Sequence, residues 1–248
     1  ELTGGQVRIG ETIFDELAAP SPMHRMLQGE VGSGKTLVAL RAMLAVVDAG
    51  GQAVMLAPTE VLAKQHFQSI TALLGDLGEG RSLGAHPDAT GVALLTGSRS
   101  TAARRDALNA IVTGEAGVVV GTHALLSDPV AFFDLGLVVI DEQHRFGVEQ
   151  RAALAAKSER KPHTLVMTAT PIPRSIAMTV FGDLEVSELR ERPKGRQPVQ
   201  TVFVNTLRNP AWVDRAWQRI REEVAAGRQA FVVCPAITAT QLESGVSA

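Results

Sequence analysis

Short apolar runs alternate with amphipathic segments along the chain. Six runs are typical of parallel strands, several of them buried on both faces, and they span residues 23–28, 52–57, 92–95, 117–120, 135–140 and 164–167. Three intervening segments place Leu, Val, Ile and Ala at the i, i+3, i+4 spacing of a helix, over residues 36–47, 60–74 and 102–112. This alternation predicts an α/β fold with a doubly wound, mainly parallel sheet. Ligands of such sheets bind beyond the carboxyl ends of the strands.

Two segments interrupt the alternation. Residues 75–91 contain Gly, Asp, Pro and His with little apolar content, which predicts a surface loop, and residues 191–198 combine Pro, Gly and charge, which predicts a linker. We therefore expect a first domain over residues 1–195 and the incomplete beginning of a second over residues 196–248. The latter is expected to form a strand, a helix and a strand, over residues 199–204, 209–226 and 229–234. One such unit of ~40 residues cannot bury a core by itself.

Composition narrows the class of protein. Of the 248 residues, 45% are hydrophobic and 20% are charged, which is typical of a globular protein. No apolar run reaches the ~18 residues that span a bilayer, and the first residues do not resemble a secretory signal. A single cysteine, Cys234, excludes a disulfide framework and a cysteine-cluster metal site. We expect a cytoplasmic protein without a membrane partner, whose net charge of −2 leaves any polyanion to a local patch.

A glycine-rich segment between the first strand and the first of these helices carries the clearest chemistry. Its sequence matches G-x-x-x-x-G-K-[ST] at every fixed position, in the order Gly29, Glu30, Val31, Gly32, Ser33, Gly34, Lys35 and Thr36. Glycines let backbone N–H groups turn toward phosphate oxygens at the positive end of the following helix. Lys35 would reach the β- and γ-phosphates, and the Thr36 hydroxyl would bind Mg²⁺. The segment predicts a phosphate-binding loop (P-loop).

Two carboxylates end the apolar run at residues 135–140. Asp141 and Glu142 would lie at the carboxyl end of a strand that we expect to be adjacent to the P-loop strand. Asp141 could then hold the Mg²⁺ shell, and Glu142 could orient or deprotonate the attacking water. An acidic exit from a strand is also common without any function. The P-loop upstream favours the catalytic interpretation.

Further short blocks follow the predicted strands in a characteristic order. Asp141 and Glu142 continue into Gln143 and His144, and the other blocks contain Pro58 with Thr59, Thr122 with His123, and Thr168 with Thr170. Each block alone fits ordinary turn and helix-cap chemistry. Together with the P-loop they resemble the ATPase core of superfamily-two helicases and translocases. The resemblance implies two RecA-like P-loop NTPase domains, the first over residues 1–195.

Three longer stretches are similar to the RecG family of bacterial ATP-dependent DNA helicases, which remodel stalled replication forks and branched recombination intermediates. They are residues 26–36, 141–151 and 167–174. The transcription-repair coupling family usually has a second Glu at the position of Gln143, so Gln143 favours RecG. Glu30 departs mildly, because RecG sequences often have Asp there. The resemblance implies ATP and Mg²⁺ as cofactors, forked or branched DNA as partner, and a monomer that needs its wedge and second motor domain for full activity.

The same resemblance assigns roles to individual residues. The expected catalytic residues are Lys35, Asp141 and Glu142. The residues expected to couple ATP hydrolysis to movement are Gln143, His144, Thr168, Thr170 and Arg174. The residues expected to contact the DNA backbone are Pro58, Thr59, Thr122 and His123. Because the ATP site of this superfamily lies between two RecA-like domains, we expect the chain alone to be a weak or inactive ATPase.

Gln6 lies in a block, residues 2–6, that is similar to the Leu-Thr-x-x-Gln block of the family. A glutamine amide can pair with the N6/N7 edge of adenine, so Gln6 is the predicted adenine contact. The alternative interpretation is a helix N-terminus capped by Thr3. Four scattered histidines lack metal-ligand spacing and are expected to be partly exposed polar residues, namely His24, His66, His86 and His163.

Two other functions stay open at this point. The chain could be a nucleotide-binding module without turnover, or a transcription-repair translocase that acts on RNA polymerase. A motor would show DNA-stimulated hydrolysis once a second RecA-like domain is present, whereas a binding module would not. A coupling factor would carry a polymerase-interaction domain, whereas a RecG-type protein would carry a wedge domain.

Overall fold

The computed structural model divides the chain into two units, Glu1–Arg196 and Gln197–Ala248. It describes residues 2–78, 80, 86–127, 130–141, 154, 157–158, 160–170, 184–191, 200–205 and 207–233. No helix in these ranges is long and apolar enough to cross a membrane. That the second unit begins another RecA-like domain stays a prediction.

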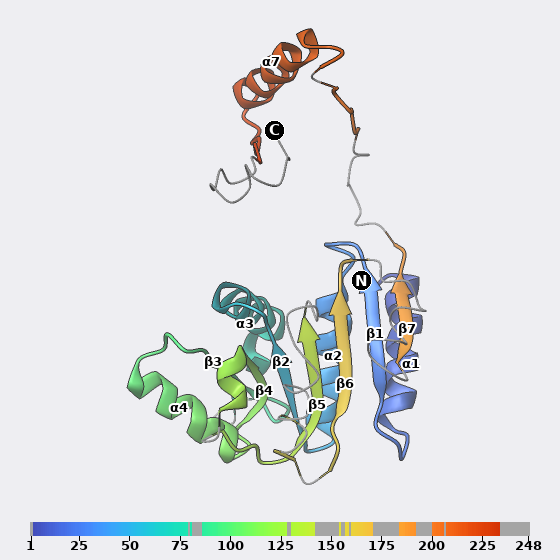
Figure 1. Cartoon of the computed structure of the whole chain (residues 1–248). Coiled ribbons are helices and arrows are strands. Elements are labelled where there is room, and N and C mark those ends of the chain that lie inside the picture. Colours follow the sequence, from blue (N-terminus) through green and yellow to red (C-terminus); the bar gives the residue numbers. More distant parts are fainter. Residues whose placement is uncertain are drawn as a thin grey trace, which may run out of the picture. The chain divides into compact units, whose positions relative to one another are not determined.

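A parallel sheet forms the first unit (Figure 1). Its seven strands are β1 (His24–Gly29), β2 (Gln52–Leu56), β3 (Gly91–Leu95), β4 (Ala116–Gly121), β5 (Leu135–Asp141), β6 (His163–Thr168) and β7 (Glu185–Leu189). They lie in the order β3-β4-β2-β5-β6-β1-β7, and all the paired strands run parallel. The predicted α/β class with a mainly parallel sheet is confirmed. Six strands match the predicted runs to within one or two residues at each end.

Helices cover both faces of the sheet, because alternate strand residues point to opposite sides. In β2, Met55 belongs to one buried cluster and Val54 to another. The first cluster includes side chains of α1 (Gly4–Leu17), α2 (Lys35–Asp48) and α3 (Glu60–Leu74). The second includes α4 (Thr101–Val112) and the short 3-10 helix η2 (His123–Leu126). Burial on both faces explains why β2 and β4 consist of buried residues throughout.

The strand order corrects one expectation. β5, which ends in Asp141, is not adjacent to the P-loop strand β1, because β6 lies between them. In the register of the sheet, Met167 of β6 is paired with Asp141 on one side and with Leu27 on the other. Two strand spacings of ~4.8 Å therefore separate Asp141 from β1. Sequence periodicity identifies strands but not the crossovers that order them, which is why the expectation was wrong.

A buried glutamine joins four parts of the first unit. Gln52 begins β2 and is 1% exposed. Its Nε2 donates to the carbonyl oxygens of Ile111 (3.0 Å) and Ala116 (2.7 Å), and its Oε1 accepts from the backbone N–H of Phe133 (2.7 Å). The amide thus connects β2 with the end of α4, the start of β4 and the segment before β5. Every polar atom of this buried side chain has a partner, as stability requires.

The second unit contains α7 (Ala211–Ala225), within the helix predicted at residues 209–226. The strands predicted around it are wrong, since residues 200–204 and 229–233 form none. An extended segment becomes a strand only when a neighbour pairs with its backbone groups. None of the described residues pairs with these two segments, and their apolar side chains are exposed, Phe203 by 87% and Val233 by 92%. Cys234 lies outside the described residues.

Candidate functional site

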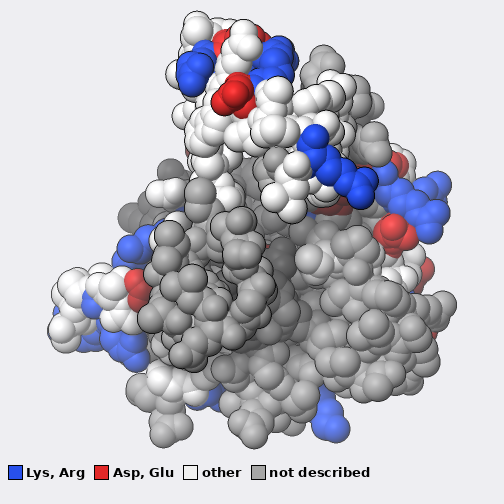
Figure 2. All heavy atoms as spheres, turned by 45° about the horizontal axis from the view of Figure 1, so that its top comes forward, with Lys and Arg blue, Asp and Glu red and all other residues white. Residues whose placement is uncertain are grey.

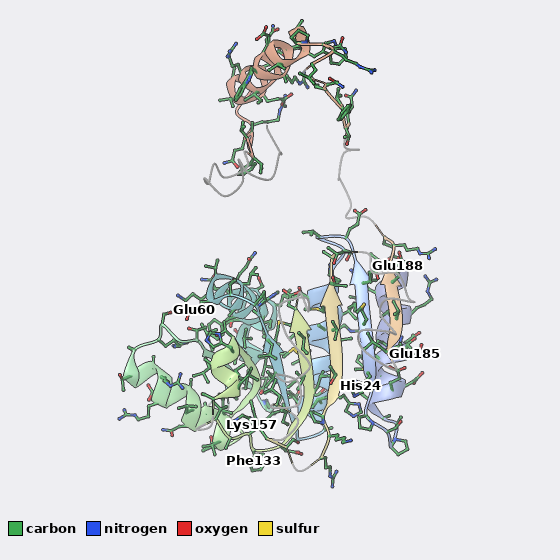
Figure 3. All side chains as sticks on the ribbon, in the orientation of Figure 1. His24, Glu60, Phe133, Lys157, Glu185 and Glu188 are labelled. Atoms are coloured by element: carbon green, nitrogen blue, oxygen red, sulfur yellow. The ribbon has the colours of Figure 1, made fainter. Side chains whose placement is uncertain are left out.

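The predicted site residues that the structure describes lie mainly at the carboxyl edge of the sheet, the upper edge in Figure 1. All paired strands are parallel, so the segments that follow β1, β2, β4, β5 and β6 emerge at this one edge. Figure 3 shows Glu60, the first residue of α3, toward this edge, whereas Phe133 and Lys157 lie at the opposite end of the sheet. The prediction that the short sequence blocks follow strands is confirmed for the block residues that the structure describes.

The P-loop connects β1 to α2. Gly34 is the N-cap of α2 and adopts a left-handed conformation with φ of +89°, which favours glycine. A Cβ atom at this position would overlap the Nε2 atom of Gln6. None of the described side chains caps α2 at this end, so its first-turn N–H groups and positive dipole end face the loop. This is the arrangement that binds an anion at a helix N-terminus.

Two polar side chains inside the loop suit a phosphate ligand. The ammonium of Lys35 donates to the carbonyl oxygens of Gly29 (2.7 Å) and Glu30 (3.0 Å), which places Nζ over the loop. Ser33 is 4% exposed, and its buried hydroxyl has no hydrogen-bond partner in the described structure. Unpaired buried hydroxyls are costly, and a bound oxygen atom would satisfy this one. The loop therefore fits a phosphate group.

Asp141 ends β5 at the same edge. Its Oδ2 atom lies 2.7 Å from Nε2 of His66, a residue of α3. The two side chains are only 14% and 13% exposed. The sequence predicts His66 only as a partly exposed polar residue, and the structure places it against the predicted magnesium ligand. The hydroxyl of Thr36 and the carboxylate of Asp141 are oxygen donors of the kind that Mg²⁺ prefers.

Thr168 ends β6, the strand that lies between the P-loop strand β1 and β5, which ends in Asp141. Thr168 is paired with Gln28 of β1 in the sheet and is 2% exposed. Its hydroxyl lies 2.9 Å from the hydroxyl of Thr170 and accepts from the Thr170 N–H at 3.2 Å. The strand order thus brings these predicted coupling residues to the centre of the candidate site.

Gln6 contacts the P-loop from α1. Thr3 is the N-cap of α1 and forms a capping box with Gln6, so the alternative interpretation of this block is confirmed. The Gln6 amide accepts from the Thr3 N–H (3.0 Å) and donates to the Ser33 carbonyl (2.9 Å). An amide has two lone pairs and two N–H bonds, so each end keeps capacity for one more partner. Contact with adenine stays a prediction.

Glu191 forms hydrogen bonds with the start of α1, and the sequence did not predict this contact. Its carboxylate accepts from the Thr3 hydroxyl and from the Gly5 N–H at 2.6 Å. These two hydrogen bonds, the Thr3 hydroxyl first, lower the pKa of Glu191. Because 188 residues separate Glu191 from Thr3 in sequence, no local pattern could indicate the contact.

The loops predicted to contact DNA differ in exposure. Pro58, Thr59 and His123 are at least partly exposed, whereas Thr122 is 1% exposed and its hydroxyl has no partner among the described residues. Thr59 is the N-cap of α3 and accepts from the Leu62 N–H at 3.3 Å. The neighbouring Glu60 accepts from both the hydroxyl and the N–H of Ser98, and these contacts, the hydroxyl first, lower its pKa. The DNA-binding roles stay predictions.

Several predicted residues lie outside the described residues. They are Glu142, Gln143, His144 and Arg174. No group of three or more His, Cys, Asp or Glu side chains that could hold a metal occurs in the part that the structure describes.

On the surface, Lys and Arg side chains are interspersed with Asp and Glu where Figure 2 is not grey.

His163 also makes a specific contact. Its Nδ1 accepts from the Met23 N–H at 2.9 Å, at the amino-terminal end of the sheet. Burial lowers the pKa of His163 below 6.5, against the opposing effect of Glu16. A ring nitrogen can accept only when it carries no proton, so the contact requires neutral His163.

Fold and site define a P-loop protein with an α/β sheet, and comparison identifies its family. Residues 8–179 match the DEAD/DEAH box helicase family, and the chain belongs to that family. Within it, the chain is 58% identical over 243 residues to the ATP-dependent DNA helicase RecG of Mycobacterium leprae, covering 97% of this chain and 33% of that protein. RecG of Mycobacterium tuberculosis H37Rv is 56% identical over 251 residues, covering 99% and 34%.

A solved structure of RecG bound to a three-way DNA junction is also similar. It is 38% identical with a TM-score of 0.76, and the match covers 99% of this chain and 31% of that one. The resemblance to RecG that the motifs indicated is therefore confirmed. The chain spans about a third of the length of the curated relatives it matches.

Proposed function

We propose that this chain is the ATP-binding part of a RecG-type ATP-dependent DNA helicase that remodels stalled replication forks and branched recombination intermediates. The observation that carries the proposal is the P-loop geometry, with the Lys35 ammonium 2.7 Å from the Gly29 carbonyl at the carboxyl edge of the sheet. The similarity to RecG over nearly the whole chain supports it. The solved RecG structure, which holds a three-way DNA junction, supports branched DNA as the partner.

The P-loop residues from Gly29 to Thr36 bind the phosphates of ATP in this proposal. Backbone N–H groups at the start of α2 and the Lys35 ammonium donate to phosphate oxygens, so Lys35 exchanges carbonyl partners for the β- and γ-phosphates. The Ser33 hydroxyl, which has no partner among the described residues, gains one. Gln6 contacts adenine with the remaining capacity of its amide.

Thr36 and Asp141 would hold Mg²⁺, which would supply positive charge to neutralise the phosphate oxygens and a field to orient the attacking water. Because β6 separates β5 from β1, Asp141 lies two strand spacings, ~10 Å, from the P-loop strand. Glu142 acts as the base for the attacking water.

The remaining roles concern coupling and DNA. Gln143, His144, Thr168, Thr170 and Arg174 couple hydrolysis to movement. Pro58, Thr59, Thr122 and His123 contact the DNA backbone. An arginine from a second RecA-like domain completes the site, and such arginines contribute ~10³–10⁵ in rate in related phosphoryl-transfer enzymes. The chain alone is therefore a weak ATPase in this proposal.

The test is ATP turnover by a protein that contains this chain and a second RecA-like domain, with and without a three-way DNA junction. We expect stimulation by DNA in the wild type. In Glu142→Gln, turnover falls ~10²-fold or more while ATP affinity stays near the wild-type value. Glu11→Gln, at an exposed position of α1, is the matched control and leaves turnover unchanged.

Two results would contradict the proposal. Turnover in Glu142→Gln equal to that of the wild type removes the catalytic role of Glu142. ATP binding without any DNA-stimulated turnover identifies a nucleotide-binding module rather than a motor.

A further inference from the structure

His66 and Asp141 form a largely buried contact at the candidate site. His66 Nε2 lies 2.7 Å from Asp141 Oδ2, and the side chains are 13% and 14% exposed. An ionised carboxylate can only accept hydrogen bonds, so Nε2 carries the proton and donates. The contact fixes one oxygen of Asp141, and among the described residues it leaves the lone pairs of Oδ1 for another ligand.

The helix that carries His66 is packed against the core and capped at its first turn. Ala63 and Ile70 of α3 are fully buried in the core on either side of His66 along the helix. At its first turn, Thr59 caps the helix and Glu60 binds Ser98, which follows β3. A side chain on such a scaffold keeps its position better than one on a loop. His66 is therefore suited to orient its partner.

From this juxtaposition, which rests on the proposed function, we propose that His66 is a positioning residue for the magnesium ligand Asp141. It holds Oδ2 on the α3 side, so that Oδ1 is presented to the metal and its water shell. Groups that hydrogen-bond to a ligating carboxylate set its orientation, and their loss typically weakens metal binding ~10- to 100-fold.

A merely structural role makes a different prediction. A buried pair that only supports the fold changes stability when it is replaced, and it leaves the metal affinity of a folded variant unchanged. The readout must therefore be metal binding in folded protein. Mn²⁺ serves as the probe, because it prefers the same oxygen ligands as Mg²⁺ and its binding is measured by electron paramagnetic resonance.

The experiment titrates Mn²⁺ into the 248-residue chain in the presence of saturating ADP. We expect His66→Leu to weaken Mn²⁺ binding ~10- to 100-fold, while ADP affinity measured without metal stays within about twofold of the wild type. His66→Gln, whose amide can donate from a similar position, restores most of the affinity. If His66→Leu does not fold, His66→Asn replaces it, since its shorter amide cannot reach Asp141.

His86→Leu is the matched control. It disrupts another histidine–aspartate pair, with His86 Nδ1 3.7 Å from Asp88 Oδ2, but these side chains are 53% and 80% exposed. This variant leaves Mn²⁺ affinity unchanged. Wild-type Mn²⁺ affinity in a folded His66→Leu or His66→Asn variant overturns the inference, as does loss of metal-free ADP binding in both. Failure of the wild type to bind ADP refutes the proposed function instead.

Discussion

Gly34 tests how the P-loop is packed, because the chain contains a matched glycine elsewhere. Gly34 and Gly50 have nearly the same positive φ, +89° and +90°. A Cβ atom at Gly50 meets nothing within 4 Å, whereas a Cβ atom at Gly34 overlaps the Gln6 amide. Alanine at both positions imposes the same backbone strain, and only Gly34→Ala displaces Gln6.

The structure sets the expected magnitudes. Left-handed backbone costs a residue with a Cβ atom ~1–2 kcal/mol, and the stiffer unfolded chain offsets part of this, so Gly50→Ala costs about 1 kcal/mol. Gly34→Ala also breaks the hydrogen bonds of the Gln6 amide to Ser33 (2.9 Å) and Thr3 (3.0 Å). At ~0.5–1.5 kcal/mol each, these bring the total to about 2–4 kcal/mol.

The assay is urea unfolding monitored by circular dichroism. Tryptophan fluorescence would not report on the P-loop unit, because both tryptophans, Trp212 and Trp217, lie in the second unit. In a Gln6→Ala background, Gly34→Ala has no amide to displace, and its cost falls to about 1 kcal/mol. Equal costs for Gly34→Ala and Gly50→Ala in the wild-type background would refute the reasoning. So would a cost of Gly34→Ala that Gln6→Ala does not reduce.

Two further predictions concern buried polar groups. Gln52→Leu leaves without a partner the backbone groups of α4, β4 and the segment before β5 that the amide now satisfies. Urea unfolding should therefore show a loss of about 2–4 kcal/mol in the free energy of unfolding, and a loss below about 1 kcal/mol would contradict this. His163 has its pKa lowered below 6.5, so the unfolded state binds the proton more readily and stability decreases as the pH falls through 6.5. His163→Asn, whose oxygen can accept from Met23, should flatten this dependence in melting curves between about pH 7 and pH 5; an unchanged dependence would contradict the assignment.

The sequence predicts most of the sheet because burial on both faces produces long apolar runs. β7 was missed since it lies at the edge of the sheet, where Glu185 and Glu188 are exposed and interrupt the pattern. The insertion of β6 between β1 and β5 could not be predicted, because periodicity carries no information about which strands become neighbours. The strands expected in the second unit fail for the related reason that apolar runs need partners to pair.

The P-loop could be read from the sequence because its residues are contiguous. His66 and Glu191 could not, since their partners lie 75 and 188 residues away. One signal for His66 was available. It shares the buried face of an amphipathic helix with Ala63 and Ile70, and a polar residue on such a face needs a partner.

The central claim, that this chain binds ATP through its P-loop, is tested most directly by calorimetric titration of MgADP into the 248-residue chain and its Lys35→Ala variant. Each charge-assisted contact is worth ~1.5–3 kcal/mol, so removing the ammonium should weaken binding at least ~10- to 100-fold. Lys161→Ala, an exposed position before β6, serves as the control and binds like the wild type. Equal affinity of wild type and Lys35→Ala would contradict the account.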